Sequence, residues 1–130
     1  MLRRPAFWFA VVVVWYTVLF FLSHQSRLHP PGPQFENRDK VYHAGYFMLG
    51  AASFFIGLRL AKPGMSLPAA VALTILLCMV GGALDEYHQS FVPNRSGNDF
   101  GDWLADSTGG VLGFLLGMVI LRTPFLRAKK

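Results

Sequence analysis

The chain has 130 residues, enough for one domain, and 53% of them are hydrophobic while only 15% are charged. A composition this apolar argues against an ordinary soluble protein and favours a membrane protein. The net charge of +5 comes without zinc-finger spacing, a glycine-rich phosphate loop or basic runs interleaved with aromatic residues, so we expect no nucleic-acid binding.

Four apolar segments predict four transmembrane helices, over about residues 5–23, 40–60, 67–88 and 102–121. A helix needs about 20 apolar residues to cross a hydrocarbon core of about 30 Å. Pro5–Ser23 and Leu67–Leu84 carry no charge over nearly that length. Ala44–Leu58 and Ser107–Leu121 reach it only when polar residues at their outer ends are included. We therefore expect an all-α fold, an integral membrane four-helix bundle that forms a single domain over residues 1–130.

Two alternatives to this bundle are weaker. Arg3 and Arg4 precede the first apolar run, as in a signal peptide, but the run is longer than a usual signal-peptide core. No small-x-small cleavage site follows it at residues 23–26, so we expect a retained helix. A soluble four-helix core would not need two uncharged runs of this length.

The connecting segments show where the helices end. Three prolines exclude a helix over residues 28–34, so the second helix is expected to begin near Asn37 or Asp39, either of which is a suitable cap. The turn at residues 62–66 is short, which makes the second and third helices antiparallel neighbours. Ser66 is the expected cap of the third helix.

Three glycines at four-residue spacing, Gly109, Gly113 and Gly117, line one face of the fourth helix. Small residues at this spacing let another helix approach closely. Small residues of the second helix are candidate partners for this contact, namely Ala44, Gly45, Ala51 and Ala52. A homo-oligomer formed through the same three glycines is the alternative use of this face.

The basic residues predict the orientation of the bundle. Eight of the twelve lie on the side of the two termini (Arg3, Arg4, Arg59, Lys62, Arg122, Arg127, Lys129 and Lys130), and four lie on the other side (Arg27, Arg38, Lys40 and Arg95). The positive-inside rule then places both termini in the cytoplasm. We expect a multi-pass protein of the bacterial cytoplasmic (inner) membrane.

All seven carboxylates and all four histidines fall within residues 24–43 and 85–106, which a four-span topology places at the same, outer face. Charged groups near lipid normally face the bundle interior and pair there. We predict one polar pocket opening outward. Its acid–base candidates are Asp39, His43 and Glu86, and its ligand-binding candidates are Lys40, Asp85, Gln89, Arg95, Asp102 and Asp106. His24 and His29 are expected to be structural, and the role of His88 is left open.

The strings DKVYHAGYFMLG at residues 39–50 and DEYHQSFVPNRSGNDFGDWLADSTGG at residues 85–110 resemble the VanZ-like family of small bacterial membrane proteins. The resemblance covers about 80 residues in order and includes nearly every polar position. It implies a link to low-level resistance to the glycopeptide teicoplanin. Asp106 departs from the family pattern, in which asparagine is frequent at this position, and the extra carboxylate favours cation binding or a contact with Arg95.

The predicted pocket has three readings. It can bind or act on a cell-envelope lipid, such as a polyprenyl phosphate or a peptidoglycan precursor, with Arg95 holding a phosphate. No cofactor is identified, although one histidine among carboxylates also suits a divalent cation. It can instead be non-catalytic, either binding a partner or forming interhelical ion pairs such as Arg95 with Asp102 and Asp106. A transporter is disfavoured because no ionisable residue lies near the middle of a span.

Overall fold

The structure is a computed structural model that describes residues 1–26, 32–124 and 126, and within those ranges it contains four helices and no strand. The helices are α1 (Pro5–Ser23), α2 (Arg38–Ala61), α3 (Leu67–Gln89) and α4 (Phe100–Leu121). Each of the four is long and apolar enough to cross a membrane. The predicted all-α membrane bundle is confirmed, and every helix begins and ends within two residues of its expected span.

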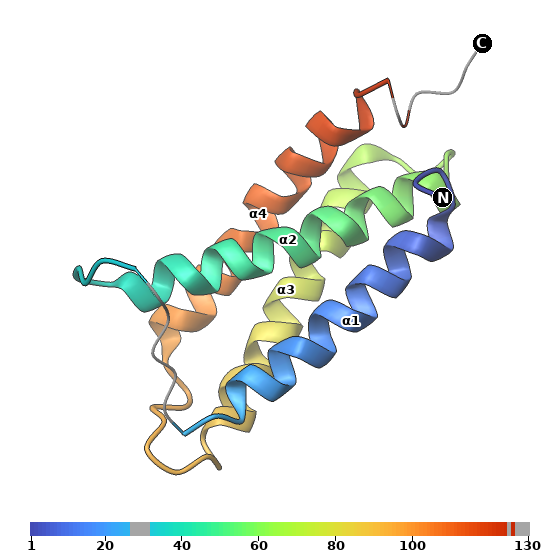
Figure 1. Ribbon diagram of the computed structural model, residues 1–130. Coiled ribbons are helices and arrows are strands. Elements are labelled where there is room, and N and C mark those ends of the chain that lie inside the picture. The colour runs from blue at the N-terminus through green and yellow to red at the C-terminus, as the bar shows by residue number, and fades with distance from the viewer. Residues whose placement is uncertain (27–31, 125, 127–130) are drawn as a thin grey trace.

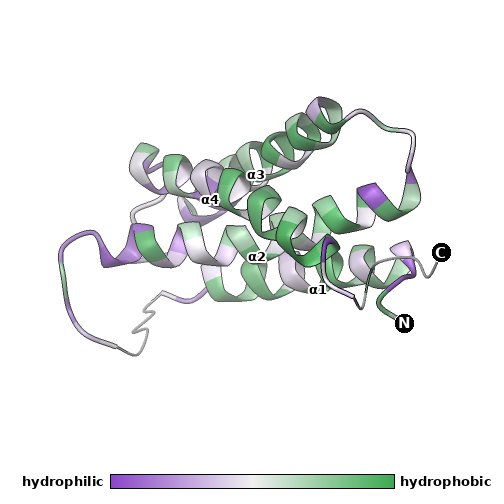
Figure 2. Ribbon diagram, turned by 90° about the horizontal axis from the view of Figure 1, so that it is seen from above, coloured by the Kyte–Doolittle hydropathy of each residue, from purple (hydrophilic) through white to green (hydrophobic). Residues whose placement is uncertain are grey.

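Successive helices run in opposite directions (Figure 1). The end of α1, the start of α2, the end of α3 and the start of α4 therefore lie together, and we call this the polar end. The start of α1 and the end of α4 lie at the opposite end. Hydrophobic residues predominate along the middle of the helices, and hydrophilic residues gather at the start of α2 and the neighbouring helix ends (Figure 2).

Capping groups account for where α3 and α4 begin. The Ser66 hydroxyl accepts a hydrogen bond from the Ala69 N–H at 3.4 Å, as predicted. At α4 the Asp99 carboxylate accepts hydrogen bonds from the N–H groups of Gly101 and Asp102, at 2.7 and 3.2 Å. Asn37 precedes α2 with a φ of 57°, but its side chain makes no capping hydrogen bond.

The most extensive helix–helix contact joins α2 to α4 along the glycine face of α4. A Cβ atom added to Gly109 would lie 2.6 Å from the carbonyl oxygen of Ala44, and one added to Gly113 would lie 2.9 Å from the backbone nitrogen of Ala52. The predicted close approach is thus present within one chain. Gly45 takes no part in it, since a Cβ there would meet no atom within 4 Å. A homo-oligomer through the α4 glycines stays a prediction.

Helix α1 docks on α2 through two reciprocal hydrogen bonds. The Trp15 indole donates to the carbonyl oxygen of Tyr46 at 3.0 Å, and the Tyr46 hydroxyl donates to the carbonyl oxygen of Trp15 at 2.8 Å. Trp15 also packs in the buried core with Phe47 and the free thiol of Cys78, which is fully buried. This contact joins the second half of α1 to α2.

Candidate functional site

The polar end contains a cluster of polar side chains that are nearly inaccessible. It is built from all four helices, and its buried members are Ser23, Asp85, Glu86, Gln89, Asp102 and Asp106. Asp106 is fully buried, and Glu86 and Asp85 are only 3% and 4% exposed. Burying a carboxylate is costly unless it is paired or hydrogen-bonded, so the partners of each one define the site.

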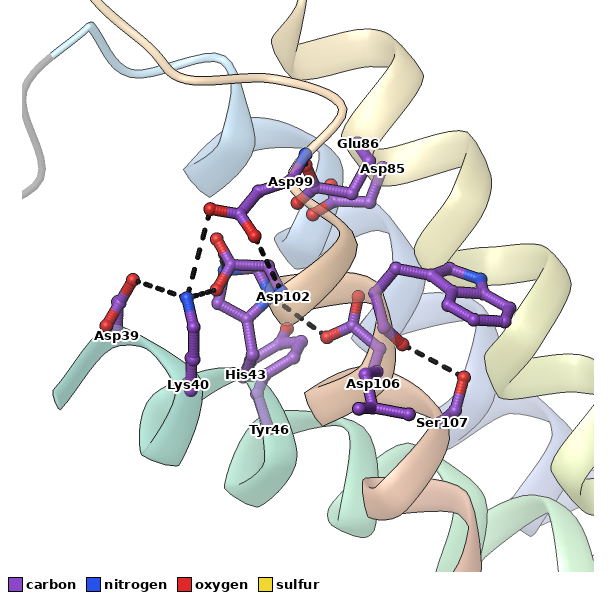
Figure 3. A network of polar contacts seen from close by, with 12 residues as sticks. Asp39, Lys40, His43, Tyr46, Asp85, Glu86, Asp99, Asp102, Asp106 and Ser107 are labelled. Atoms are coloured by element: carbon purple, nitrogen blue, oxygen red, sulfur yellow. Dashed lines mark hydrogen bonds and ion pairs between the residues drawn. The ribbon is translucent and has the colours of Figure 1, made fainter. Parts of the chain in front are cut away.

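Lys40 of α2 supplies positive charge at the rim of the cluster. Its Nζ lies 3.0 Å from Oδ1 of Asp102, 3.3 Å from Asp39 and 3.8 Å from Asp99 (Figure 3). The Asp102 side chain is 9% exposed, whereas that of Asp39 is 60% exposed. The closest of these ion pairs therefore links α2 to the buried carboxylate of α4, and Asp39 lies outside the buried cluster.

His43 lies between two carboxylates of α4. Its Nδ1 is 2.9 Å from Oδ1 of Asp106, and its Nε2 is 3.9 Å from Oδ2 of Asp102. Asp106 fits close to α3 because residue 82 is a glycine. A Cβ atom on Gly82 would lie 2.6 Å from Oδ2 of Asp106. The absence of a side chain at this position thus makes the His43–Asp106 pair sterically possible.

A second chain of contacts runs from α1 through α3 to the loop before α4. The Ser23 hydroxyl donates a hydrogen bond to Asp85 Oδ1, and the Gln89 amide donates to Asp85 Oδ2 at 2.7 Å. The Arg95 guanidinium in turn donates to Gln89 Oε1 at 2.7 Å. Asp85 is therefore held by two neutral donors.

Glu86 connects the loop before α4 to α3 through hydrogen bonds. Its Oε2 accepts a hydrogen bond from the backbone N–H of Asp99 at 2.7 Å, and its carbonyl oxygen accepts one from the N–H of Asn98 at 3.2 Å. Its other carboxylate oxygen, Oε1, is buried without a hydrogen-bond partner. The same is true of Nε of Arg95 and Oδ2 of Asp106. Buried polar atoms are normally satisfied, so these three atoms have unused capacity to bind a ligand.

Three of these residues could hold a metal ion. His43, Asp85 and Glu86 each offer a ligand atom, and the three atoms lie within 4.8 Å of one another. Carboxylate oxygens and an imidazole nitrogen together suit a divalent cation.

The structure therefore brings together eight of the nine predicted site residues, in one network at the polar end: Lys40, His43, Asp85, Glu86, Gln89, Arg95, Asp102 and Asp106. Within the described residues, Asp39 contacts the network only through Lys40. The alternative pairing of Arg95 with Asp102 and Asp106 is not observed within the described residues. Those carboxylates contact Lys40 and His43 instead.

In the part of the chain that the structure describes, the side chains of His24 and His88 make no hydrogen bond or ion pair with this network and pair with each other instead. His24 and His88 contact each other at 3.3 Å between their ring nitrogens, in an exposed position where both rings pack near Phe20. His29 lies outside the described residues. Sequence reasoning missed Ser23, which anchors Asp85. One feature of the sequence could have indicated Ser23, because it is the last residue of the first apolar run and directly precedes the first polar segment.

Comparison with known proteins identifies one relationship. A model of the VanZ/LLP1 family matches residues 7–122, which is nearly the whole chain. No curated protein and no solved structure matches it.

Proposed function

We propose that this chain, which belongs to the VanZ/LLP1 family, binds the phosphate-bearing head group of a lipid-linked cell-envelope molecule at its polar end. The polyprenyl phosphates and peptidoglycan precursors of the bacterial cytoplasmic membrane are the substrate class. In this proposal the polar end faces outward and both termini face the cytoplasm. The expected phenotype is glycopeptide (teicoplanin) resistance. The proposal covers binding, and the acid–base roles of Asp39, His43 and Glu86 stay predictions.

The observation that supports the proposal most directly is that Arg95 has no carboxylate partner among the described residues. Within the residues that the structure describes, Arg95 forms no ion pair, although the cluster beside it is rich in carboxylates. It donates one hydrogen bond to Gln89, and its Nε is buried without a partner. A guanidinium binds phosphate through two parallel N–H donors. An arginine left unpaired in this setting is suited to bind an external anion.

The apolar surface next to the cluster supports a lipid ligand. A groove of about 430 Å³ runs along α1 and α3, with Tyr16, Leu73, Val80 and Leu84 among its lining residues. Leu84 directly precedes Asp85, so one end of the groove reaches the level of the polar cluster along α3. A lipid could place its chain in the groove and its head group at the polar end.

Native mass spectrometry of the protein extracted with its lipids tests this proposal. Wild type should retain a phosphate-bearing lipid, and Arg95→Ala should lose it. Arg122→Ala is the matched control, because it removes an arginine at the opposite end of α4. Equal retention by all three proteins would contradict the role of Arg95.

A resistance assay tests the biological role. Glu86→Gln should abolish glycopeptide resistance while the protein still inserts in the membrane. Glu36→Gln makes the same chemical change at an exposed position of the loop between α1 and α2, and it should leave resistance intact. Full resistance with Glu86→Gln would remove the site hypothesis.

A purely structural role is the second candidate, and the interhelical ion pairs favour it. Lys40–Asp102 and His43–Asp106 both join α2 to α4. Replacing a buried ion pair with apolar residues of similar size is often neutral or stabilising, and Lys40–Asp102 is partly buried. The double variant Lys40→Met with Asp102→Leu should therefore keep both stability and resistance if the charges only hold the bundle together. It should lose resistance if they belong to a ligand site.

A further inference from the structure

We infer that the polar end holds one divalent metal cation, bound by His43 of α2 and by Asp85 and Glu86 of α3. The ligand atoms of these three residues lie within 4.8 Å of one another. Metal bonds of about 2.1 Å place opposite ligand atoms about 4.2 Å apart and neighbouring ones about 3.0–3.4 Å apart. In this proposal, rotations of the three side chains close the remaining gap and bring all three atoms onto one ion.

Charge balance is the first argument for the cation. Asp85 and Glu86 are adjacent in sequence and only 4% and 3% exposed, and neither has an ion-pair partner in the part of the chain that the structure describes. Lys40 pairs with aspartates, and Arg95 donates to the neutral amide of Gln89, so neither side chain neutralises these two carboxylates. Two buried carboxylates without a counter-charge are strongly unfavourable. One divalent cation neutralises both.

The second argument is the orientation of His43. A histidine that binds a metal usually donates its other ring N–H to a carboxylate, which fixes its tautomer and ring direction. The contact of Nδ1 with the fully buried Asp106, at 2.9 Å, supplies this arrangement. With the proton on Nδ1, Nε2 keeps its lone pair for a metal.

Each carboxylate of the trio is likewise held in place and left with a free lone pair. Asp85 accepts hydrogen bonds from Ser23 and Gln89, one on each oxygen, and each oxygen has a second lone pair. Glu86 is held through Oε2, while its buried Oε1 has no partner. Figure 3 shows the carboxylates of Asp85 and Glu86 pointing from α3 toward the side where His43 lies.

The ligand set selects the class of metal. One imidazole and two carboxylates favour a first-row ion such as Mn²⁺ or Zn²⁺, whereas Ca²⁺ takes about six to eight oxygen ligands. Three protein ligands leave coordination positions open. The biological use of the ion rests on the proposed function, since a cation here would offset the acidic cluster and accept a phosphate oxygen.

The test is Mn²⁺ binding to the full chain in detergent micelles, after removal of metals and lipid, followed by electron paramagnetic resonance. We expect one tightly bound Mn²⁺ per chain. Pulsed measurements on this wild-type complex should detect the coupling of one imidazole nitrogen, and this readout needs no variant. Glu86→Gln and Asp85→Asn should abolish binding, and the exposed Glu36→Gln should keep it. Asp106→Asn should weaken binding about 10- to 100-fold, because Asp106 only positions His43.

Absence of tight binding in wild type, with either Mn²⁺ or Zn²⁺, would overturn the inference. Binding without a nitrogen coupling, or binding that survives in Glu86→Gln, would also overturn it. Lipid retention is measured separately on metal-stripped protein. If the protein retains lipid but binds no cation, this inference is refuted and the proposed function stands. If it binds the cation but retains no lipid, this inference stands and the proposed function is refuted.

Discussion

The contact between Gly82 and Asp106 makes the strongest prediction about how the site depends on the fold. In Gly82→Ala the new Cβ would lie 2.6 Å from Oδ2 and 2.8 Å from Cβ of Asp106. Carbon–carbon contacts are optimal at about 3.5–4.0 Å, so Asp106 must retreat by about 0.7 Å. A retreat of this size away from His43 lengthens their hydrogen bond from 2.9 Å to about 3.6 Å, and the bond is then lost.

The expected cost follows from three terms. Overpacking costs about 1–3 kcal/mol, and losing a hydrogen bond to a charged group costs about 1.5–3 kcal/mol. Alanine has a higher helix propensity than glycine, and this difference offsets about 1 kcal/mol of the cost. We therefore expect Gly82→Ala to lower the free energy of unfolding by about 1.5–5 kcal/mol. The assay is a titration of the micellar protein with a denaturing detergent, followed by tryptophan fluorescence.

Two controls isolate the contact. Gly45→Ala, also within a helix, adds a Cβ that meets no atom within 4 Å, so it should be neutral or stabilising by up to about 1 kcal/mol. In an Asp106→Gly background the Gly82→Ala substitution has room, and its cost should largely vanish. If Gly82→Ala is as stable as wild type, or equally costly in both backgrounds, the reasoning is refuted.

Three further predictions concern the bundle. Lys40→Met removes the closest cation of buried Asp102 and should cost about 1–3 kcal/mol in the same titration, whereas Lys62→Met at the opposite end should be neutral. Gly113→Ala places a Cβ 2.7–2.9 Å from backbone atoms of α2 and should cost about 1–3 kcal/mol, so a neutral result would contradict the close α2–α4 packing. Reporters fused to either terminus should both read cytoplasmic, and an external signal from either one would overturn the predicted orientation.

The helices and the gathering of polar residues at one end could be predicted from the sequence alone. A chain in hydrocarbon must satisfy its backbone hydrogen bonds internally, so an apolar run of spanning length has little choice but to form a helix. Four such runs joined in series must alternate in direction. The segments around Asp39 and Glu86 then meet at the same end, whatever the details of packing.

Only the tertiary structure decided which polar groups pair. Neighbouring helix positions differ by about 100° in direction, so Asp39 lies exposed while Lys40 reaches Asp102. Asp39 and His43 are four residues apart in α2, but His43 contacts Asp106 because the close α2–α4 packing brings that carboxylate within reach.

The same reason explains the contacts that sequence reasoning missed. Ser23 and Gly82 show no motif, and their roles arise from where α1 and α4 lie against α3. The sequence by itself determined the four membrane helices and the end at which the charges gather. The rotation and spacing of those helices decided which charges are paired, which are buried, and which keep an atom free for a ligand.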